Sequence, residues 1–203
     1  MEYVNNLDEL MIKPCITFVD LLKFRRSIRD YQDRKVSPGL IKSIIKESTL
    51  APSSGNDQPW KFIIINDKAI LKKMSDESKK NVLARIASNP MDYAKRFEKI
   101  LRVESFNVFF NAPCLILILG FPALKNMYVD CASVANYFML SAASRGLGTC
   151  WVNLGSEIKS PELLSELGIP EDCKIIAPII LGYPARIPRP PKRKKPDIKI
   201  IGG

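Results

Sequence analysis

Two short segments, Arg25-Arg26-Ser27-Ile28-Arg29 and Ala51-Pro52-Ser53-Ser54-Gly55-Asn56-Asp57-Gln58-Pro59-Trp60, carry most of the information in this chain. The first segment places three guanidinium groups and one hydroxyl within five residues. The second is a polar turn, rich in hydroxyl and amide side chains, that precedes an apolar strand pattern. Guanidinium groups suit phosphate oxygens because they bind them in a bidentate geometry with a permanent charge. Serine, asparagine and glutamine suit sugar hydroxyls and ring amides because they both donate and accept hydrogen bonds.

Together the two segments predict a site for a ligand with a phosphate, several hydroxyls and an aromatic ring system. Flavin mononucleotide (FMN) has all of these parts. Each segment alone has a simpler interpretation, since a basic last turn suits the helix dipole and a polar turn suits a solvated loop. Their occurrence in one chain, with Gln58-Pro59-Trp60 and a strand following, favours the ligand site.

The composition predicts one domain over residues 1–203, with its core at about 16–196. The chain has no histidine, which excludes Ser-His-Asp and Cys-His catalysis and most histidine-based metal sites. The pattern shows no signal peptide and no apolar run of membrane-spanning length, so we expect no membrane association. The absence of a CxxC pair argues against a zinc ribbon. Five widely spaced cysteines predict reduced, buried thiols in a cytoplasmic protein: Cys15, Cys114, Cys131, Cys150 and Cys173.

The net charge of +10 has two interpretations. A lysine-rich solvated surface is the simpler one, and attraction of an anionic ligand or polymer is the other. Binding to nucleic acid is a minor alternative, because no helix-turn-helix, RRM or zinc-finger pattern is present.

Hydrophobic periodicity predicts alternating helices and strands, hence an α/β or α+β domain. A Rossmann site is not supported, since Gly146-Leu147-Gly148 follows a helix and does not complete GxGxxG. Residues 183–196 are expected to be extended, and residues 197–201 are a candidate last strand. The predicted helices cover residues 16–26, 39–50 (capped by Ser37), 67–86, 91–101, 128–145 and 160–168, and the predicted strands cover 60–65, 113–119, 149–153 and 174–182.

The chain resembles the FMN-dependent nitroreductase family. The resemblance rests on the two segments above, on Gly146-Leu147-Gly148-Thr149-Cys150-Trp151 and on Ile179-Ile180-Leu181-Gly182-Tyr183-Pro184, which occur in the family's order. It implies an α+β fold of three layers, with a central, mainly antiparallel sheet flanked by helices. It also implies a homodimer with two FMN sites at the subunit interface. Many relatives carry a longer C-terminal extension that wraps around the partner subunit. The resemblance therefore leaves open how tightly two copies of this chain associate.

The resemblance also implies roles for individual residues. Arg25, Arg26, Ser27 and Arg29 would hold the phosphate and ribityl chain, and Pro52, Ser53, Ser54 and Asn56 would reach the same flavin from the other subunit. The segment Cys150-Trp151-Val152-Asn153 would lie along the isoalloxazine ring and offer backbone N–H groups toward its N5 edge. Basic residues before Pro196 would contact the phosphate. Lys192 and Lys194 are favoured, because positions i and i+2 of an extended chain point the same way, while a one-residue change of register selects Arg193 and Lys195 instead.

The implied activity is an oxidoreductase that passes a hydride from NADH or NADPH through FMN to a nitroaromatic, a quinone or a similar acceptor. One site used twice predicts ping-pong kinetics, and no side-chain acid or base is required. Cys150 is more readily explained as a small apolar filler beside the ring than as a redox residue. A flavin-binding module without efficient turnover is the alternative, and a flavin-destroying or dehalogenating relative ranks lower.

Overall fold

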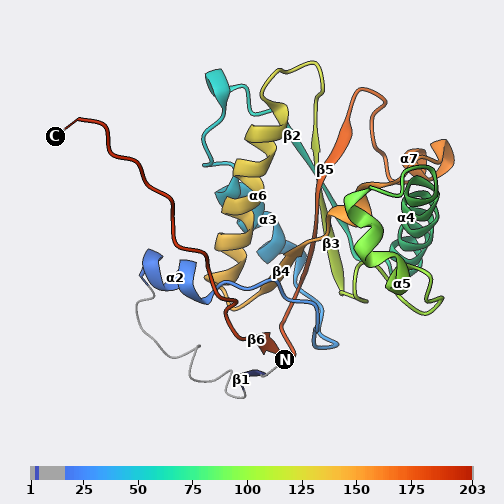
Figure 1. Ribbon diagram of the computed structural model, residues 1–203, viewed down its shortest axis with the longest axis horizontal. Helices are drawn as coiled ribbons and strands as arrows, with labels where there is room; N and C mark the ends of the chain where they lie inside the picture. Colours follow the sequence, from blue (N-terminus) through green and yellow to red (C-terminus); the bar gives the residue numbers. More distant parts are fainter. Residues whose placement is uncertain (1–2, 5–16, 203) are drawn as a thin grey trace.

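The computed structural model describes residues 3–4 and 17–202, and its centre is a four-stranded antiparallel sheet (Figure 1). The strand order is β2 (Trp60–Ile65), β3 (Cys114–Gly120), β5 (Lys174–Gly182) and β4 (Gly148–Trp151). Every residue of β3 is buried, because this strand is central and helices cover both faces of the sheet. The continuous apolar run predicted this double cover.

Helices form a layer on each face of the sheet, as Figure 1 shows. One layer holds α3 (Pro38–Ser48) and α6 (Met127–Ala143), and the other holds α4 (Lys68–Ser88), α5 (Glu98–Leu101) and α7 (Pro161–Glu166). Each layer packs its own hydrophobic cluster against the sheet. The largest buried side chains include Phe138 in the first cluster and Phe109 in the second. The predicted three-layer α+β architecture is thus confirmed.

Side-chain caps set the beginnings of three helices. The Ser37 hydroxyl accepts a hydrogen bond from the Leu40 N–H at the start of α3 (3.3 Å), and the Ser160 hydroxyl accepts one from the Leu163 N–H in α7 (3.1 Å). The Asp67 carboxylate accepts from two N–H groups at the start of α4. Such caps satisfy donors that have no partner within the helix. They account for the agreement between predicted and observed helix starts.

The predicted helix over residues 91–101 is wrong in type. The structure has a 3₁₀ helix, η2 (Tyr93–Phe97), followed by the four residues of α5. The Asp92 carboxylate bonds the Ala94 N–H (2.8 Å), and the Asn89 side chain bonds the Met91 N–H (3.2 Å). These local hydrogen bonds compete with a continuous α-helix at its start.

Strand β4 ends two residues earlier than predicted. Trp151 pairs with Ile179, and the next position on β5 is Pro178, which has no N–H to continue the ladder. The Val152 N–H still donates to the Pro178 carbonyl (2.8 Å), and the chain then turns into the 3₁₀ helix η3 (Asn153–Ser156). Asn153 therefore begins a helical turn and does not lie in a strand.

The two ends of the described chain differ from the prediction as well. Helix α2 covers Phe18–Phe24, because Arg25 leaves the helix with an extended backbone (φ −55°, ψ 130°). Residues 197–201 form no strand, since none of the strands in residues 3–4 and 17–202 pairs with them. Strands β1 (Tyr3–Val4) and β6 (Ile187–Pro188) form a small second sheet, and beyond β6 the chain runs away from the body as an exposed arm (Figure 1).

Four cysteines, Cys114, Cys131, Cys150 and Cys173, are free and buried, which confirms the thiol prediction for them. Cys15 lies outside the described residues, as does the first residue of the helix predicted to begin at residue 16. Within the described ranges, none of the helices combines the length and hydropathy that a membrane crossing requires.

Candidate functional site

The first predicted segment lies directly against strand β4. Ser27 forms a parallel bridge with Thr149, and the Ile28 N–H donates to the Thr149 carbonyl (2.9 Å). The Ile28 side chain is buried against Gly148, where a Cβ would stand 2.7 Å from Ile28 Cγ1. Glycine at position 148 is therefore what allows this close approach. The arginine segment and the β4 segment, which are more than 100 residues apart in sequence, form one surface.

We predict that Gly148→Ala lowers the free energy of unfolding by about 1–3 kcal/mol, because its Cβ would push against the branched carbon of Ile28. Gly39→Ala is the matched control, since a Cβ at this position of helix α3 meets nothing within 4 Å. The control should raise stability by about 0.5–1 kcal/mol, as expected for removing a glycine from a helix. Urea denaturation of both variants tests the pair. If Gly148→Ala is as stable as Gly39→Ala, the contact between position 148 and Ile28 has room for a Cβ.

Three guanidinium groups gather at this surface without acidic partners. Arg25 and Arg26 are half-buried and Arg29 is exposed, and in the described part of the chain none of the three forms an ion pair. The Arg26 Nη1 donates to the Arg25 carbonyl (2.6 Å). Burial lowers the pKa of Arg26, and the charges of Arg25 and Arg193 lower it further. Such clustering of unneutralised positive charge is suited to an anionic ligand.

Strand β4 carries a buried thiol on one face and two buried, unpartnered polar atoms on the other. Burial raises the pKa of the Cys150 thiol, while the charge of Arg29, a hydrogen bond with Ser27 and the charge of Arg25 act in the opposite direction. The raised pKa keeps this thiol protonated and favours the filler role over a redox role. Thr149 Oγ1 and Trp151 Nε1 are buried and form no hydrogen bond with the described chain.

In the segment from Cys150 to Asn153, one backbone donor is already engaged within the chain. The Val152 N–H donates to the Pro178 carbonyl. A ligand along this segment therefore has to accept hydrogen bonds from the N–H groups of neighbouring residues. Asn153 is the first residue of η3, and the first N–H groups of a helical turn have no partner within it.

The second predicted segment is a tightly organised turn. The Ser53 hydroxyl accepts from the Gln58 N–H (3.1 Å), and the Ser54 N–H donates to Asp130 Oδ1 (3.1 Å). The Asn126 side chain also donates to the Ser54 hydroxyl (2.7 Å). Asn56 has a φ of 61°, in the left-handed region that asparagine tolerates better than most residues. Pro52 precedes the turn, which lies at the N-terminal end of α6.

One chain does not bring its two predicted halves together. The polar turn contacts the N-terminal end of α6, through Asn126 and Asp130, whereas the arginine segment contacts Gly148 and Thr149, just beyond its C-terminal end. Helix α6 has 17 residues, so its ends are about 25 Å apart at 1.5 Å per residue. Figure 1 shows the same separation along α6. A ligand that touches both segments has to span this distance or meet the second segment on another copy of the chain.

The C-terminal arm places a different basic residue near the arginines than the one favoured from the sequence. The charge of Arg193 acts on Arg26, as noted above. Lys192 and Lys194 are exposed, like the rest of the arm around them. Arg193 is thus the residue of the arm whose charge acts on Arg26, and the register of the phosphate contacts stays a prediction.

Tyr31 carries no functional signal in the sequence, but in the structure it supports the arginine segment. Its hydroxyl donates to the Ile28 carbonyl (2.8 Å), and its ring fills the space beside Gly182, where a Cβ would lie 2.7 Å from Tyr31 Cδ1. Burial raises its pKa well above the usual range, so the phenol stays neutral. No pattern in the sequence signals this contact, because it depends on the pairing of Tyr31 with Pro184.

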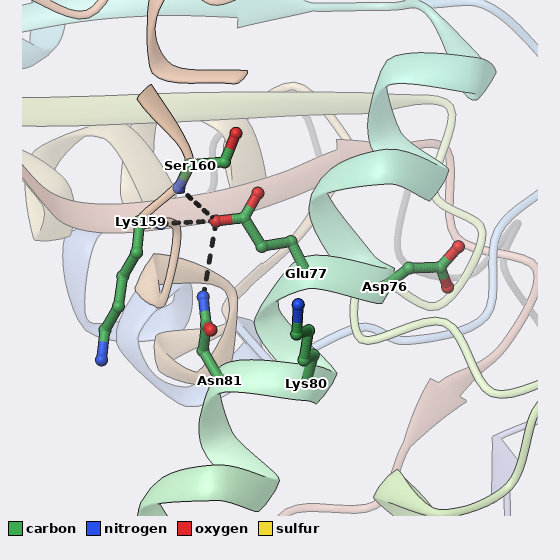
Figure 2. Close-up of a pocket in the computed structure, with 6 residues that line it drawn as sticks. All are labelled: Asp76, Glu77, Lys80, Asn81, Lys159 and Ser160. Carbon is green, nitrogen blue, oxygen red and sulfur yellow. Dashed lines mark hydrogen bonds between the residues drawn. The ribbon is translucent and has the colours of Figure 1, made fainter. Parts of the chain in front are cut away.

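A surface pocket elsewhere, between α4 and the start of α7, is shown in Figure 2. Its central acid, Glu77, accepts hydrogen bonds from the backbone N–H groups of Lys159 (2.5 Å) and Ser160 (2.6 Å) and from the Asn81 side chain. This carboxylate is therefore engaged in holding the loop before α7. The described residues also contain no group of three or more potential metal ligands. The arginine surface remains the stronger candidate.

Comparison with known proteins identifies the family of this chain. The family model described as "Nitroreductase family" matches residues 22–183. A protein of Archaeoglobus fulgidus, provisionally named NADH dehydrogenase/NAD(P)H nitroreductase, is 34% identical over 79% of this chain and 81% of its own length. Iodotyrosine deiodinase 1 of Sus scrofa is 28% identical over 94% of this chain and 70% of its own length.

Among solved structures, a nitroreductase with bound FMN from Bacteroides fragilis superposes with a TM-score of 0.77 at 24% identity. The superposition covers 91% of this chain and 98% of that one, and it confirms the fold. The family match extends over most of the chain and includes three of the four segments in full, the arginine cluster, the polar turn and the β4 segment, together with the fourth up to Tyr183. The chain belongs to the nitroreductase family.

Proposed function

We propose that this protein is an FMN-dependent oxidoreductase. The observation that carries the proposal is the cluster of three guanidinium groups, which have no acidic partner among the described residues and lie beside strand β4. A phosphate dianion would neutralise this cluster. Family membership and the FMN named for the Bacteroides fragilis structure support the same cofactor.

The residues present fit FMN in the following way. Arg25, Arg26 and Ser27 would bind the phosphate and ribityl chain, and Arg29 would bring positive charge to the flavin. The backbone near Asn153 would donate toward the N5 edge. When bound, FMN supplies hydride transfer, and the protein supplies position and charge. Positive charge near the N1–C2 edge stabilises a reduced, anionic ring relative to the oxidised one.

We propose further that the working form is a homodimer. Helix α2 has no buried residue, and a seven-residue helix is marginal without packing. Its apolar side chains Phe18, Val19 and Leu22 are more than half exposed, as are Tyr128 and Val129 on α6. A second copy covering this face would bury them and would bring its own polar turn, including Pro52, Ser53, Ser54 and Asn56, to the arginine surface.

The proposed reaction takes a hydride from NADH or NADPH and delivers reducing equivalents to a nitroaromatic, a quinone or a similar small molecule. The name of the Archaeoglobus fulgidus relative supports the donor. Since donor and acceptor would use the same face of the flavin in turn, ping-pong kinetics are expected. The deiodinase relative adds iodinated phenols as a second acceptor class worth testing. Four buried free thiols support a cytoplasmic location.

An absorbance spectrum of the purified protein, before and after incubation with FMN and removal of the excess, tests the cofactor. About one flavin per chain is expected, and a colourless protein that cannot be reconstituted would overturn the proposal and make an oligonucleotide-binding assay the next experiment. Initial rates with NADH and NADPH against menadione, nitrofurazone and 3-iodotyrosine then test turnover. Parallel reciprocal plots support ping-pong kinetics, and oxidation no faster than with free FMN would indicate a flavin-binding module.

The arm gives a prediction about register. Arg193→Ala should weaken FMN binding about tenfold or more, because a charge-assisted contact to phosphate contributes roughly 1.5–3 kcal/mol. Lys192→Ala and Lys194→Ala, which remove the same charge from neighbouring positions, are the matched controls and should change the dissociation constant less than threefold. Fluorescence quenching of FMN measures all three. The reverse order of effects would restore the register favoured from the sequence.

A further inference from the structure

The turn before β3 holds two consecutive residues in a conformation that non-glycine residues rarely adopt. Phe110 has a φ of 53° and Asn111 a φ of 51°. For a bulky residue such as Phe110 this left-handed backbone is an outlier that costs about 1–3 kcal/mol, and such strain concentrates at functional sites. The contacts of the Phe110 ring give a physical reason for this conformation.

The Phe110 ring lies under the guanidinium group of Arg29. The Arg29 Cζ atom stands 5.6 Å from the ring centroid, within the range of a cation–π contact. No acidic side chain of the described residues pairs with Arg29. The Phe110 ring is therefore the group that its guanidinium charge contacts. Phe110 also meets the Phe106 ring in a T-shaped arrangement, with centroids 5.7 Å apart and an interplanar angle of 85°.

Helix α4 anchors the turn that carries Phe110. Lys79 is 9% exposed, and its ammonium group donates to the carbonyls of Val103, Glu104 and Phe106 at 2.9–3.0 Å. The Ser75 hydroxyl accepts from the Val108 N–H (3.0 Å). With so many contacts from one rigid helix, the turn is over-determined, which is the condition under which a strained backbone persists.

The same turn supports the β4 side of the site. The Phe109 ring occupies the space beside Gly155, where a Cβ would lie 2.3 Å from its Cε1 atom. Gly155 belongs to η3, which begins at Asn153. Phe109 and Phe110 are thus adjacent residues that point to the two parts of the candidate site, the η3 turn and Arg29.

We propose that Phe110 is a positioning residue for Arg29, and that the strained turn exists to present its ring beneath the guanidinium group. The inference rests on the proposed function, because it assumes that Arg29 faces bound FMN. An arginine without a carboxylate partner has many rotamers, and the ring restricts them to those that direct the charge toward the surface shared with Ser27 and Cys150. The use of a ring instead of a carboxylate leaves the positive charge available to the ligand.

A double-mutant cycle tests the proposal. In otherwise wild-type protein, Phe110→Leu should weaken FMN binding about two- to fivefold, the value of an exposed cation–π contact. Phe110→Tyr keeps the ring and should stay within a factor of two. In an Arg29→Ala background, Phe110→Leu should have no further effect, since the residue acts through Arg29. Phe97→Leu, which removes a ring stacked on Arg96 instead, is the matched control and should leave binding unchanged.

The midpoint potential of the bound flavin gives a second readout that a purely structural role would not move. Loss of oriented positive charge weakens binding of the reduced, anionic ring more than of the oxidised ring. A threefold difference between these two losses lowers the potential by about 14 mV, since tenfold is 29.6 mV for two electrons. Phe110→Leu should lower the potential of the bound flavin, and Phe110→Tyr, which keeps the ring, should leave it at the wild-type value.

The outcomes distinguish a failure of the proposed function from a failure of the positioning role of Phe110. If wild-type protein binds no FMN, both the proposed function and this inference fail. If FMN binds and Arg29→Ala weakens it, but Phe110→Leu has no effect or adds independently to Arg29→Ala, only the positioning role fails. Should Phe110→Leu not fold, a pentafluorophenylalanine at position 110 keeps the size of the ring and reverses its quadrupole, and unchanged binding by that protein overturns the inference.

Discussion

Replacing Arg25 and Arg29 together by alanine is expected to release FMN while the protein stays folded. A hydrogen bond to a charged group contributes about 1.5–3 kcal/mol, so the loss of two such contacts weakens binding by about 100-fold or more. The fold should survive, because neither side chain is fully buried or forms an ion pair within the described chain. The segment between them stays attached to β4 through Ile28, whose contacts the substitutions leave in place.

The measurement is the flavin content after dialysis, with circular dichroism and the melting temperature recorded on the same sample. Arg96→Ala with Arg102→Ala is the matched control. It removes the same charge from the 93–102 region, where Arg96 stacks on aromatic rings and Arg102 pairs with Glu98. The control should retain its flavin. If the double variant at the candidate site keeps FMN as tightly as the wild type, the assignment of Arg25 to the phosphate and of Arg29 to the flavin is wrong.

The strands and the capped helices were predictable because their signals are local. Strands β2 and β5 begin and end at the predicted residues, since an apolar, largely β-branched run is bounded on each side by polar or turn-forming residues. Ser37 and Ser160 cap the helices that they were expected to cap. Where the sequence carries a cap or an apolar run of the right length, little tertiary information is needed.

The errors have two causes, distant residues that decide the local structure and side chains that bond the backbone beside them. The end of β4 depends on Pro178 in the neighbouring strand, and the 91–101 segment depends on side chains that bond the backbone beside them. The apolar residues of the last segment, such as Ile198 and Ile200, suggested a strand, but no neighbouring strand lies beside them in the described chain. A strand pattern without a partner does not make a strand.

The candidate site was predictable by residue type but not by geometry. The arginine cluster and the polar turn carry their chemistry in the sequence itself, whereas the approach of Arg193 to Arg26 depends on the path of the arm. Phe110 gave no signal at all, because a left-handed backbone at a phenylalanine has no sequence pattern. Nor does the sequence show that the two segments lie at opposite ends of α6, and this separation leads to the strongest test of the site.

Two different inactive chains are expected to restore one working site when they form a dimer together. In one chain Arg25 and Arg29 are replaced by alanine. In the other the turn is changed by Ser53→Ala, Ser54→Ala and Asn56→Gly, where glycine suits the φ of 61°. Neither homodimer should bind FMN well. In a twofold-symmetric heterodimer, one site combines both defects and the other combines the two intact segments.

The heterodimer, isolated with two different affinity tags, should therefore bind about one FMN per dimer with wild-type affinity. The matched control joins a wild-type chain to one that carries all five substitutions. If each site is shared between chains, both sites of this control are damaged and binding is lost. If each site lies within one chain, the results reverse: the control binds one FMN and the first heterodimer binds none. Because the two segments of one chain lie about 25 Å apart along α6, we expect the shared arrangement.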